Sequence, residues 1–155
     1  MKLKNTKYQN FLEVLTAILV LSTWIFLMLN WSSIPNTVPG HYNAAGIVDR
    51  WGNKNEILII PIASIVLYLL VTIASFFPGL WNVPVKISEG NKKFVYENLK
   101  TLLLAMKMEI SAIFLYILYC DIKTQAVGIW FLPIILIMIF GTIIYYIIVI
   151  RKRSK

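Results

Sequence analysis

The stretch Gly128–Ile150, GIWFLPIILIMIFGTIIYYIIVI, contains no charged residue and shows no polar face at helical spacing. A surface helix of a soluble protein would show such a face. The stretch is long enough to cross a hydrocarbon core, which needs about 20 apolar residues. It therefore predicts a transmembrane helix.

Three further apolar runs precede it, at Phe11–Trp31, Ile57–Phe77 and Thr101–Cys120. Lipid offers no hydrogen-bond partner to the backbone, so each crossing must be a helix or part of a closed barrel. The runs lack the alternation of barrel strands. With 59% hydrophobic and 14% charged residues, the sequence predicts an all-α polytopic membrane protein. We expect one domain, 1–155, with helices at about residues 11–31, 57–77, 101–120 and 128–150.

Basic residues are distributed unevenly between the two sides of this arrangement. Eleven lie near the termini or between the second and third helices, and three lie on the opposite side. Cytoplasmic loops carry the excess of Lys and Arg, so both termini should be cytoplasmic. The first group is Lys2, Lys4, Lys7, Lys86, Lys92, Lys93, Lys100, Arg151, Lys152, Arg153 and Lys155, and the second is Arg50, Lys54 and Lys123.

This asymmetry accounts for the net charge of +8 without a nucleic-acid partner. We expect membrane lipids to be partners of the basic C-terminal tail. The first apolar run is too long for the core of a signal peptide and is followed by no cleavage signal, so we expect it to be an uncleaved helix. These features predict a multi-pass protein of the cytoplasmic membrane.

The connections between the helices are also informative. The short segment Asp121–Val127 makes the third and fourth helices antiparallel neighbours. Asn91 is a candidate helix cap, and Phe94, Val95, Leu99 and Leu102 follow at helical spacing. They predict an amphipathic segment on the inner membrane surface, with an ordinary loop as the alternative. The single cysteine, Cys120, excludes an intrachain disulfide and is expected to be a packing residue.

Polar residues concentrate in Pro39–Lys54, PGHYNAAGIVDRWGNK, which holds the only histidine of the chain. Its prolines restrict the backbone, and its Gly and Asn residues tolerate turns. The composition predicts a compact loop that folds back between the first two helices, on the outer side. The candidate ligand-binding residues are His41, Asn43, Gly46, Asp49, Arg50, Trp51, Gly52 and Lys54.

Several kinds of chemistry are open to these residues. A metal site would need His41, Asp49 and Glu56 together, but a lone histidine is a weak signal, so we expect no metal and no cofactor. An acid–base pair would need His41 beside Asp49. The side chains could instead bond to the loop backbone and lipid headgroups, or form a recognition surface. We hypothesise that His41, Asn43 and Asp49 converge on one polar site.

Three charged residues lie inside the predicted membrane helices: Glu13, Lys107 and Glu109. Lys107 and Glu109 are two residues apart and point to nearly opposite sides of one helix. We expect Lys107 to extend toward the cytoplasmic face, to water or lipid phosphate, with contact to Glu13 as the alternative. Glu109 should face the bundle interior, bonded to a hydroxyl or amide, or protonated.

The pattern P-x-H-x-N-x-x-G-x-x-D-x-W-G-x-K, read from Pro39 to Lys54, is long and specific. With the surrounding segment Trp31–Leu103, it resembles domain-of-unknown-function family 1648 of bacterial membrane proteins, which also forms the front half of Sdp-type immunity proteins. The resemblance implies a polytopic membrane protein. In the Sdp case it implies protection against a secreted peptide toxin, with a second role in signalling. The sequence ends after four predicted helices, whereas the full immunity protein has a second half.

We therefore rank three functions. The first is an immunity-type protein that binds, or gives resistance to, a membrane-active peptide (bacteriocin resistance) and relays a signal. Its partners would be a secreted antimicrobial peptide or another membrane protein. The second is a membrane-surface enzyme that uses His41 and Asp49, although no nucleophile motif is present. The third is a small transporter, which the scarcity of charged residues in the helices disfavours.

Overall fold

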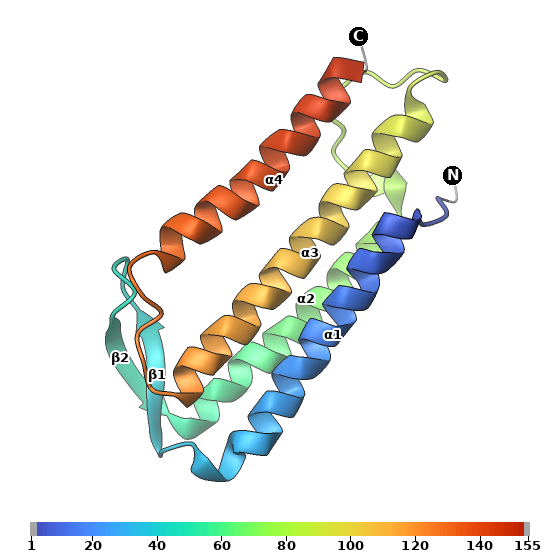
Figure 1. Ribbon diagram of the computed structural model, residues 1–155. Helices are drawn as coiled ribbons and strands as arrows, with labels where there is room; N and C mark the ends of the chain where they lie inside the picture. The colour runs from blue at the N-terminus through green and yellow to red at the C-terminus, as the bar shows by residue number, and fades with distance from the viewer. Residues whose placement is uncertain (1–2, 154–155) are drawn as a thin grey trace.

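Four long helices dominate the computed structural model, which describes residues 3–153 (Figure 1). Lys2 and Lys155, which the charge count includes, lie outside the described residues. An antiparallel hairpin joins the first two helices. The elements are α1 (Lys7–Asn30), η1 (Trp31–Ser33), β1 (Thr37–Tyr42), β2 (Val48–Asn53), η2 (Lys54–Leu58), α2 (Ile59–Ser75), η3 (Pro78–Leu80), α3 (Lys92–Ile122) and α4 (Phe131–Arg153).

Within residues 3–153, four helices are long and apolar enough to cross a membrane. This confirms the predicted class of a mainly helical protein with four candidate membrane spans. Figure 1 shows the N- and C-terminal ends at one end of the bundle and the hairpin at the other. The hairpin is the compact structure expected between the first two helices, but its two strands were not predicted.

The helix ends differ from the predicted ones for local reasons. α1 begins at Lys7, before residue 11, because Thr6 and Gln9 form a capping box: each side chain accepts the backbone N–H of the other, at 3.1 and 3.0 Å. The side-chain amide of Gln9 also donates to the Glu97 carbonyl and the Thr101 hydroxyl of α3. α2 and α4 begin two and three residues later than predicted, at Ile59 and Phe131.

α3 corrects a second expectation. Lys92–Ile122 is one continuous helix, so residues 92–100 form neither a separate surface segment nor a loop. Val95 and Leu99 are buried in a cluster with Ile150 of α4, which explains their helical spacing. Asn91 occupies the cap position, but its side chain bonds to the backbone of the preceding turn and not to the helix.

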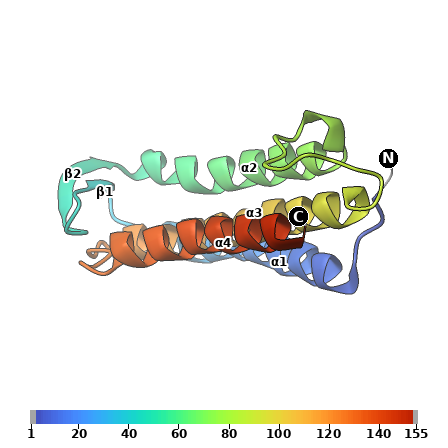
Figure 2. The same cartoon turned by 90° about the horizontal axis from the view of Figure 1, so that it is seen from above.

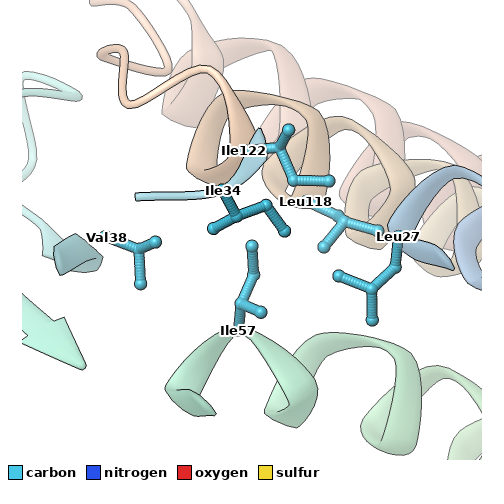
Figure 3. Packing of buried hydrophobic residues seen from close by; sticks show 6 residues of the cluster. All are labelled: Leu27, Ile34, Val38, Ile57, Leu118 and Ile122. Atoms are coloured by element: carbon cyan, nitrogen blue, oxygen red, sulfur yellow. The ribbon is translucent and has the colours of Figure 1, made fainter. Parts of the chain in front are cut away.

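The core is divided along the bundle. α1, α2 and α3 pack against one another, and α4 packs mainly against α3; Figure 2 shows α4 and α2 on different sides of the molecule. The largest buried cluster lies at the hairpin end, where strand β1 contributes a fully buried valine. Figure 3 shows this cluster, which consists of Leu27, Ile34, Val38, Ile57, Leu118 and Ile122.

Candidate functional site

The hairpin is built by its own motif residues. Asn43 begins the turn: its backbone N–H bonds to the Ile47 carbonyl at 2.9 Å, and its side-chain oxygen accepts the N–H groups of Ala45 and Ile47. Such a side chain fixes a turn without help from other elements. Asn43 is therefore a turn-forming residue, and its side-chain oxygen is engaged by the turn backbone and not by His41 or Asp49.

The turn of the hairpin packs against the loop between α3 and α4. The carbonyl of Gly46 accepts the N–H of Val127 at 3.0 Å. Gly46 has a φ of +73°, and a Cβ there would collide with the backbone of Gly128. Only glycine permits both the backbone conformation and this close approach. The motif glycine thus holds the hairpin on the end of the bundle.

A tyrosine on strand β1 also binds the hairpin to the end of α3 and the loop that follows it. The hydroxyl of Tyr42 donates to the Asp121 carboxylate at 2.7 Å and lies 3.2 Å from the Gln125 carbonyl. Burial, the hydrogen bond and the negative charge of Asp121 raise the pKa of Tyr42 above its usual range, so its hydroxyl stays a donor. Both residues were absent from the candidates chosen from the sequence; a carboxylate directly after the apolar run 110–120 was the available signal for Asp121.

The basic residues of the motif bind the second strand to the neighbouring helix ends. Arg50 donates to the Glu56 carboxylate at 2.9 Å and to the Gly40 carbonyl. Glu56 also accepts the N–H of Asn53, and a Cβ on Gly52 would collide with the Glu56 carboxylate. Glu56 is therefore occupied by the hairpin. Among residues 3–153, no three His, Cys, Asp or Glu side chains form a group that could hold a metal ion.

Lys54, Trp31 and Trp51 also lie at the hairpin end of the bundle. The Lys54 ammonium bonds to the Trp31 carbonyl and lies 4.7 Å from the centre of the Trp31 ring, as in a cation–π contact. Trp51 is exposed on β2. An exposed indole at the end of a transmembrane bundle is suited to the membrane interface.

His41 and Asp49 form the exposed polar pair of the hairpin. The Nδ1 atom of His41 lies 2.6 Å from a carboxylate oxygen of Asp49, and the two side chains are 65% and 42% exposed. Asp49 fixes the orientation of the imidazole and leaves its Nε2 atom free of this bond. Because neither residue is needed to close the turn, the pair is available for recognition or proton transfer.

Two recesses adjoin the pair. A polar one of about 130 Å³ is lined in part by His41, Tyr42, Arg50, Glu56 and Asp121. The second, of about 370 Å³, is lined by His41, Tyr42, Asn43, Ala44, Gly46, Val127, Phe131 and Leu132. It combines the polar face of the hairpin with the apolar start of α4.

An apolar groove of about 450 Å³ runs between α3 and α4 and shares Val127 and Phe131 with the second recess. No charged residue lines it, and the hydroxyl of Tyr116, its main polar group, is bonded to the Val127 carbonyl at 3.0 Å. The second recess, with its polar side on the hairpin, and an apolar groove thus meet at the hairpin end of the bundle. Such a surface can hold a molecule with one polar and one apolar part.

The charged residues inside the bundle have partners from other helices. Lys107 donates to Glu13 at 2.6 Å and to Thr72 at 3.0 Å, and its ammonium lies 4.6 Å from the centre of the Tyr68 ring. The alternative that we gave for Lys107, contact with Glu13, is therefore the one observed. Glu109 accepts the hydroxyl of Thr142 at 2.6 Å, as expected of a residue facing the bundle interior.

Comparisons with known proteins agree with the resemblance to family 1648. Residues 18–65 match the family model described as Domain of unknown function (DUF1648), a segment that spans most of α1, the hairpin and the start of α2. An uncharacterized protein of Archaeoglobus fulgidus is 33% identical over 78 residues, covering 45% of this chain and 43% of that protein. The chain thus aligns with less than half of that relative. No solved structure matches the chain.

Proposed function

We propose that this chain is an immunity-type membrane protein that binds an amphipathic, membrane-active peptide at the hairpin end of its bundle. The basic residues support an orientation in the cytoplasmic membrane with the hairpin outside and both termini inside. A peptide that arrives from outside and partitions into the interface would then meet the hairpin first. Capture there would keep it from the rest of the membrane.

The observation that carries this proposal is the junction of the second recess, which has a polar side on the hairpin, with the apolar groove. The second recess and the groove have Val127 and Phe131 in common, so they form one surface. Its hairpin side includes His41, which is paired with Asp49, and its helix side is lined by mostly apolar residues, with the Tyr116 hydroxyl bonded to Val127. An amphipathic helix presents the same two kinds of surface side by side.

The arrangement also supports transmission of a signal along α4. Near the middle of α4, Thr142 donates a hydrogen bond to Glu109 of α3. The buried residue Ile150 lies near the C-terminal end of α4, away from the hairpin. A peptide wedged between α3 and α4 would displace α4, and the displacement would reach the basic residues after Ile150. A partner membrane protein that contacts these basic residues at the inner surface would respond to this movement.

The test of this function is survival of cells that make the protein. The full chain is expressed in a sensitive bacterial strain, which is challenged with synthetic amphipathic cationic helices. We expect wild-type protein to raise the lethal dose about tenfold, a difference of about 1.4 kcal/mol in binding if capture is limiting. Ala112→Trp, which fills the groove, should abolish protection.

Variants of the exposed pair address the polar half. His41→Ala and Asp49→Asn should each lose protection at wild-type membrane levels, measured by immunoblot, and a chelator should leave wild-type protection intact. Glu89→Gln is the matched control, because this side chain is 93% exposed at the other end of the bundle. If His41→Ala, Asp49→Asn and Ala112→Trp all protect as well as wild type, the hairpin end is not a peptide site.

The His41–Asp49 distance favours one second candidate, a membrane-surface enzyme. A carboxylate at 2.6 Å orients the imidazole for general-base action on a water molecule or a substrate hydroxyl. In that case His41→Ala should remove activity toward headgroup esters, while Asp49→Asn should lower kcat and shift the pH profile. A purified protein with no such activity in vesicles of phosphatidylglycerol would dismiss this candidate.

A further inference from the structure

One helical turn inward of the apolar groove between α3 and α4 lies a polar pair that the lining of the groove does not include. Glu109 precedes the groove residues Ala112 and Ile113 by three and four positions on α3, and Thr142 follows the groove residue Met138 by four positions on α4. Residues at these spacings share a helix face. The Glu109–Thr142 pair therefore lies at the inner end of the groove.

The carboxylate of Glu109 is only half satisfied. Glu109 is only 7% exposed. One of its carboxylate oxygens, Oε1, accepts a hydrogen bond from the Thr142 hydroxyl at 2.6 Å. The other oxygen, Oε2, is buried and has no hydrogen-bond partner among residues 3–153. A buried polar atom left in this state destabilises the folded protein, and more so if the group is charged.

The nearest buried cation of α3 does not supply the missing donor. Lys107 is two residues away, on the opposite side of the helix, and is already bonded to Glu13 and Thr72. Glu109 lies near the middle of α3 and Thr142 near the middle of α4, where a membrane-spanning bundle is surrounded by hydrocarbon. A molecule that enters the groove with a basic group would supply a donor for Oε2.

We propose that the groove holds an apolar peptide segment with one basic side chain, whose ammonium group donates to Oε2 of Glu109. The inference rests on the proposed function and adds to it a chemical criterion for the peptide. The apolar lining accepts the body of the segment, and Thr142 holds the carboxylate in one orientation. A charge-assisted bond to a carboxylate is about twice as strong as a neutral one, so a lysine in register is selected over an aliphatic residue.

The test uses two synthetic peptides that differ at one position. Both are Leu–Ala helices of about 20 residues, long enough to cross the membrane. One has lysine at its centre, the other has norleucine, and each carries a dansyl group. Binding to the full-length protein in phosphatidylcholine vesicles is followed by energy transfer from the tryptophans of the protein, of which Trp130 lines the groove.

We expect wild-type protein to bind the lysine peptide about tenfold more tightly than the norleucine peptide, equivalent to about 1.4 kcal/mol. Glu109→Gln should remove this preference, and Thr142→Val should reduce it. Glu97→Gln is the matched control, since it is the same substitution on α3 at a partly exposed side chain away from the groove, and it should keep the preference.

A second readout requires no substitution. Dicyclohexylcarbodiimide modifies protonated carboxyl groups in apolar surroundings, and mass spectrometry identifies the residue modified. The lysine peptide should slow the modification of Glu109 in wild-type protein, and the norleucine peptide should not. This measurement keeps the proposal testable if Glu109→Gln fails to fold.

The outcomes separate this inference from the proposed function. If both peptides bind wild-type protein equally and Ala112→Trp abolishes both, the groove is a peptide site but the assignment of Glu109 is wrong. If Glu109→Gln keeps the lysine preference, the assignment is also wrong. If neither peptide binds wild-type protein, the groove is not a site for such a segment, and the inference and its premise fall together.

Discussion

Lys107 is fully buried in α3, and its ammonium group contacts three other side chains. Glu13 of α1 accepts one hydrogen bond, Thr72 of α2 accepts another, and the ring of Tyr68 lies beneath the charge. A buried ammonium needs this many partners because its desolvation is expensive. One side chain thus connects three of the four long helices.

Replacing either Lys107 or Glu13 should destabilise the bundle. Replacing both should lower the free energy of unfolding by less than the sum of the two single losses. Lys107→Met leaves the Glu13 carboxylate unpaired and should cost about 3–5 kcal/mol. Glu13→Gln should cost about as much, because it leaves the fully buried Lys107 ammonium without a counter-charge, although the glutamine can still accept its hydrogen bond. The free energy of unfolding is measured in mixed micelles for both single variants and for the double variant.

The coupling between the two sites should be about 1–3 kcal/mol, as for residues in direct contact. Lys93→Met is the matched control, since the Lys93 side chain is 82% exposed on the same helix, and it should change stability by less than about 0.5 kcal/mol. Additive losses at Glu13 and Lys107 would mean that the two side chains do not interact in the folded protein.

At the scale of single elements, the hairpin depends on how closely its turn approaches the loop before α4. Gly46 and Gly128 both have positive φ angles, of 73° and 93°. A Cβ at Gly128 meets no atom within 4 Å, whereas a Cβ at Gly46 collides with the Gly128 backbone. The two positions therefore separate the cost of conformation from the cost of the contact.

Gly128→Ala should destabilise the protein by about 1 kcal/mol, the usual cost of a residue held in that conformation. Gly46→Ala should cost more and should also release the hydrogen bond from Val127 to Gly46. Amide hydrogen exchange at Val127 reports this bond directly, and exchange should accelerate in Gly46→Ala. Equal exchange at Val127 in both variants would show that the turn does not pack against this loop.

The helices could be predicted because hydrophobicity decides them, and the hairpin could not. The run Gly128–Ile150 differs from α4 by three residues at each end. The strands contain Pro39 and Gly40, residues that oppose a strand prediction, but each strand of a two-stranded hairpin has a free edge that tolerates proline. α3 exceeded its apolar run because its first turns are amphipathic and packed against protein.

The candidate site divides in the same way. The motif residues could be selected by their density, but sequence alone did not separate the residues that build the hairpin, such as Asn43 and Gly46, from the exposed pair. That distinction depends on contacts across long separations, such as Tyr42 with Asp121 and Gly46 with Val127. The partners Thr72 and Thr142 were equally out of reach, because a threonine in an apolar helix carries no signal of its neighbour.

At the scale of the whole molecule, function depends on which end of the bundle faces outward. Within residues 3–153, nine basic residues lie at the end with the termini and three at the end with the hairpin. We therefore predict that the turn of the hairpin is reached from outside the cell and the loop before α3 only from inside. Ala44 and Glu89 are suitable positions, because both are exposed and neither side chain supports its turn.

Ala44→Cys and Glu89→Cys are introduced separately into a chain that carries Cys120→Ala, which removes the single native thiol. An impermeant maleimide added to intact cells should label Ala44→Cys, and Glu89→Cys should be labelled only after the membrane is opened. Labelling of Glu89→Cys alone in intact cells would show that the protein has the opposite orientation in the membrane. The hairpin and the outer end of the groove would then face the cytoplasm, where a peptide arriving from outside could not reach them first.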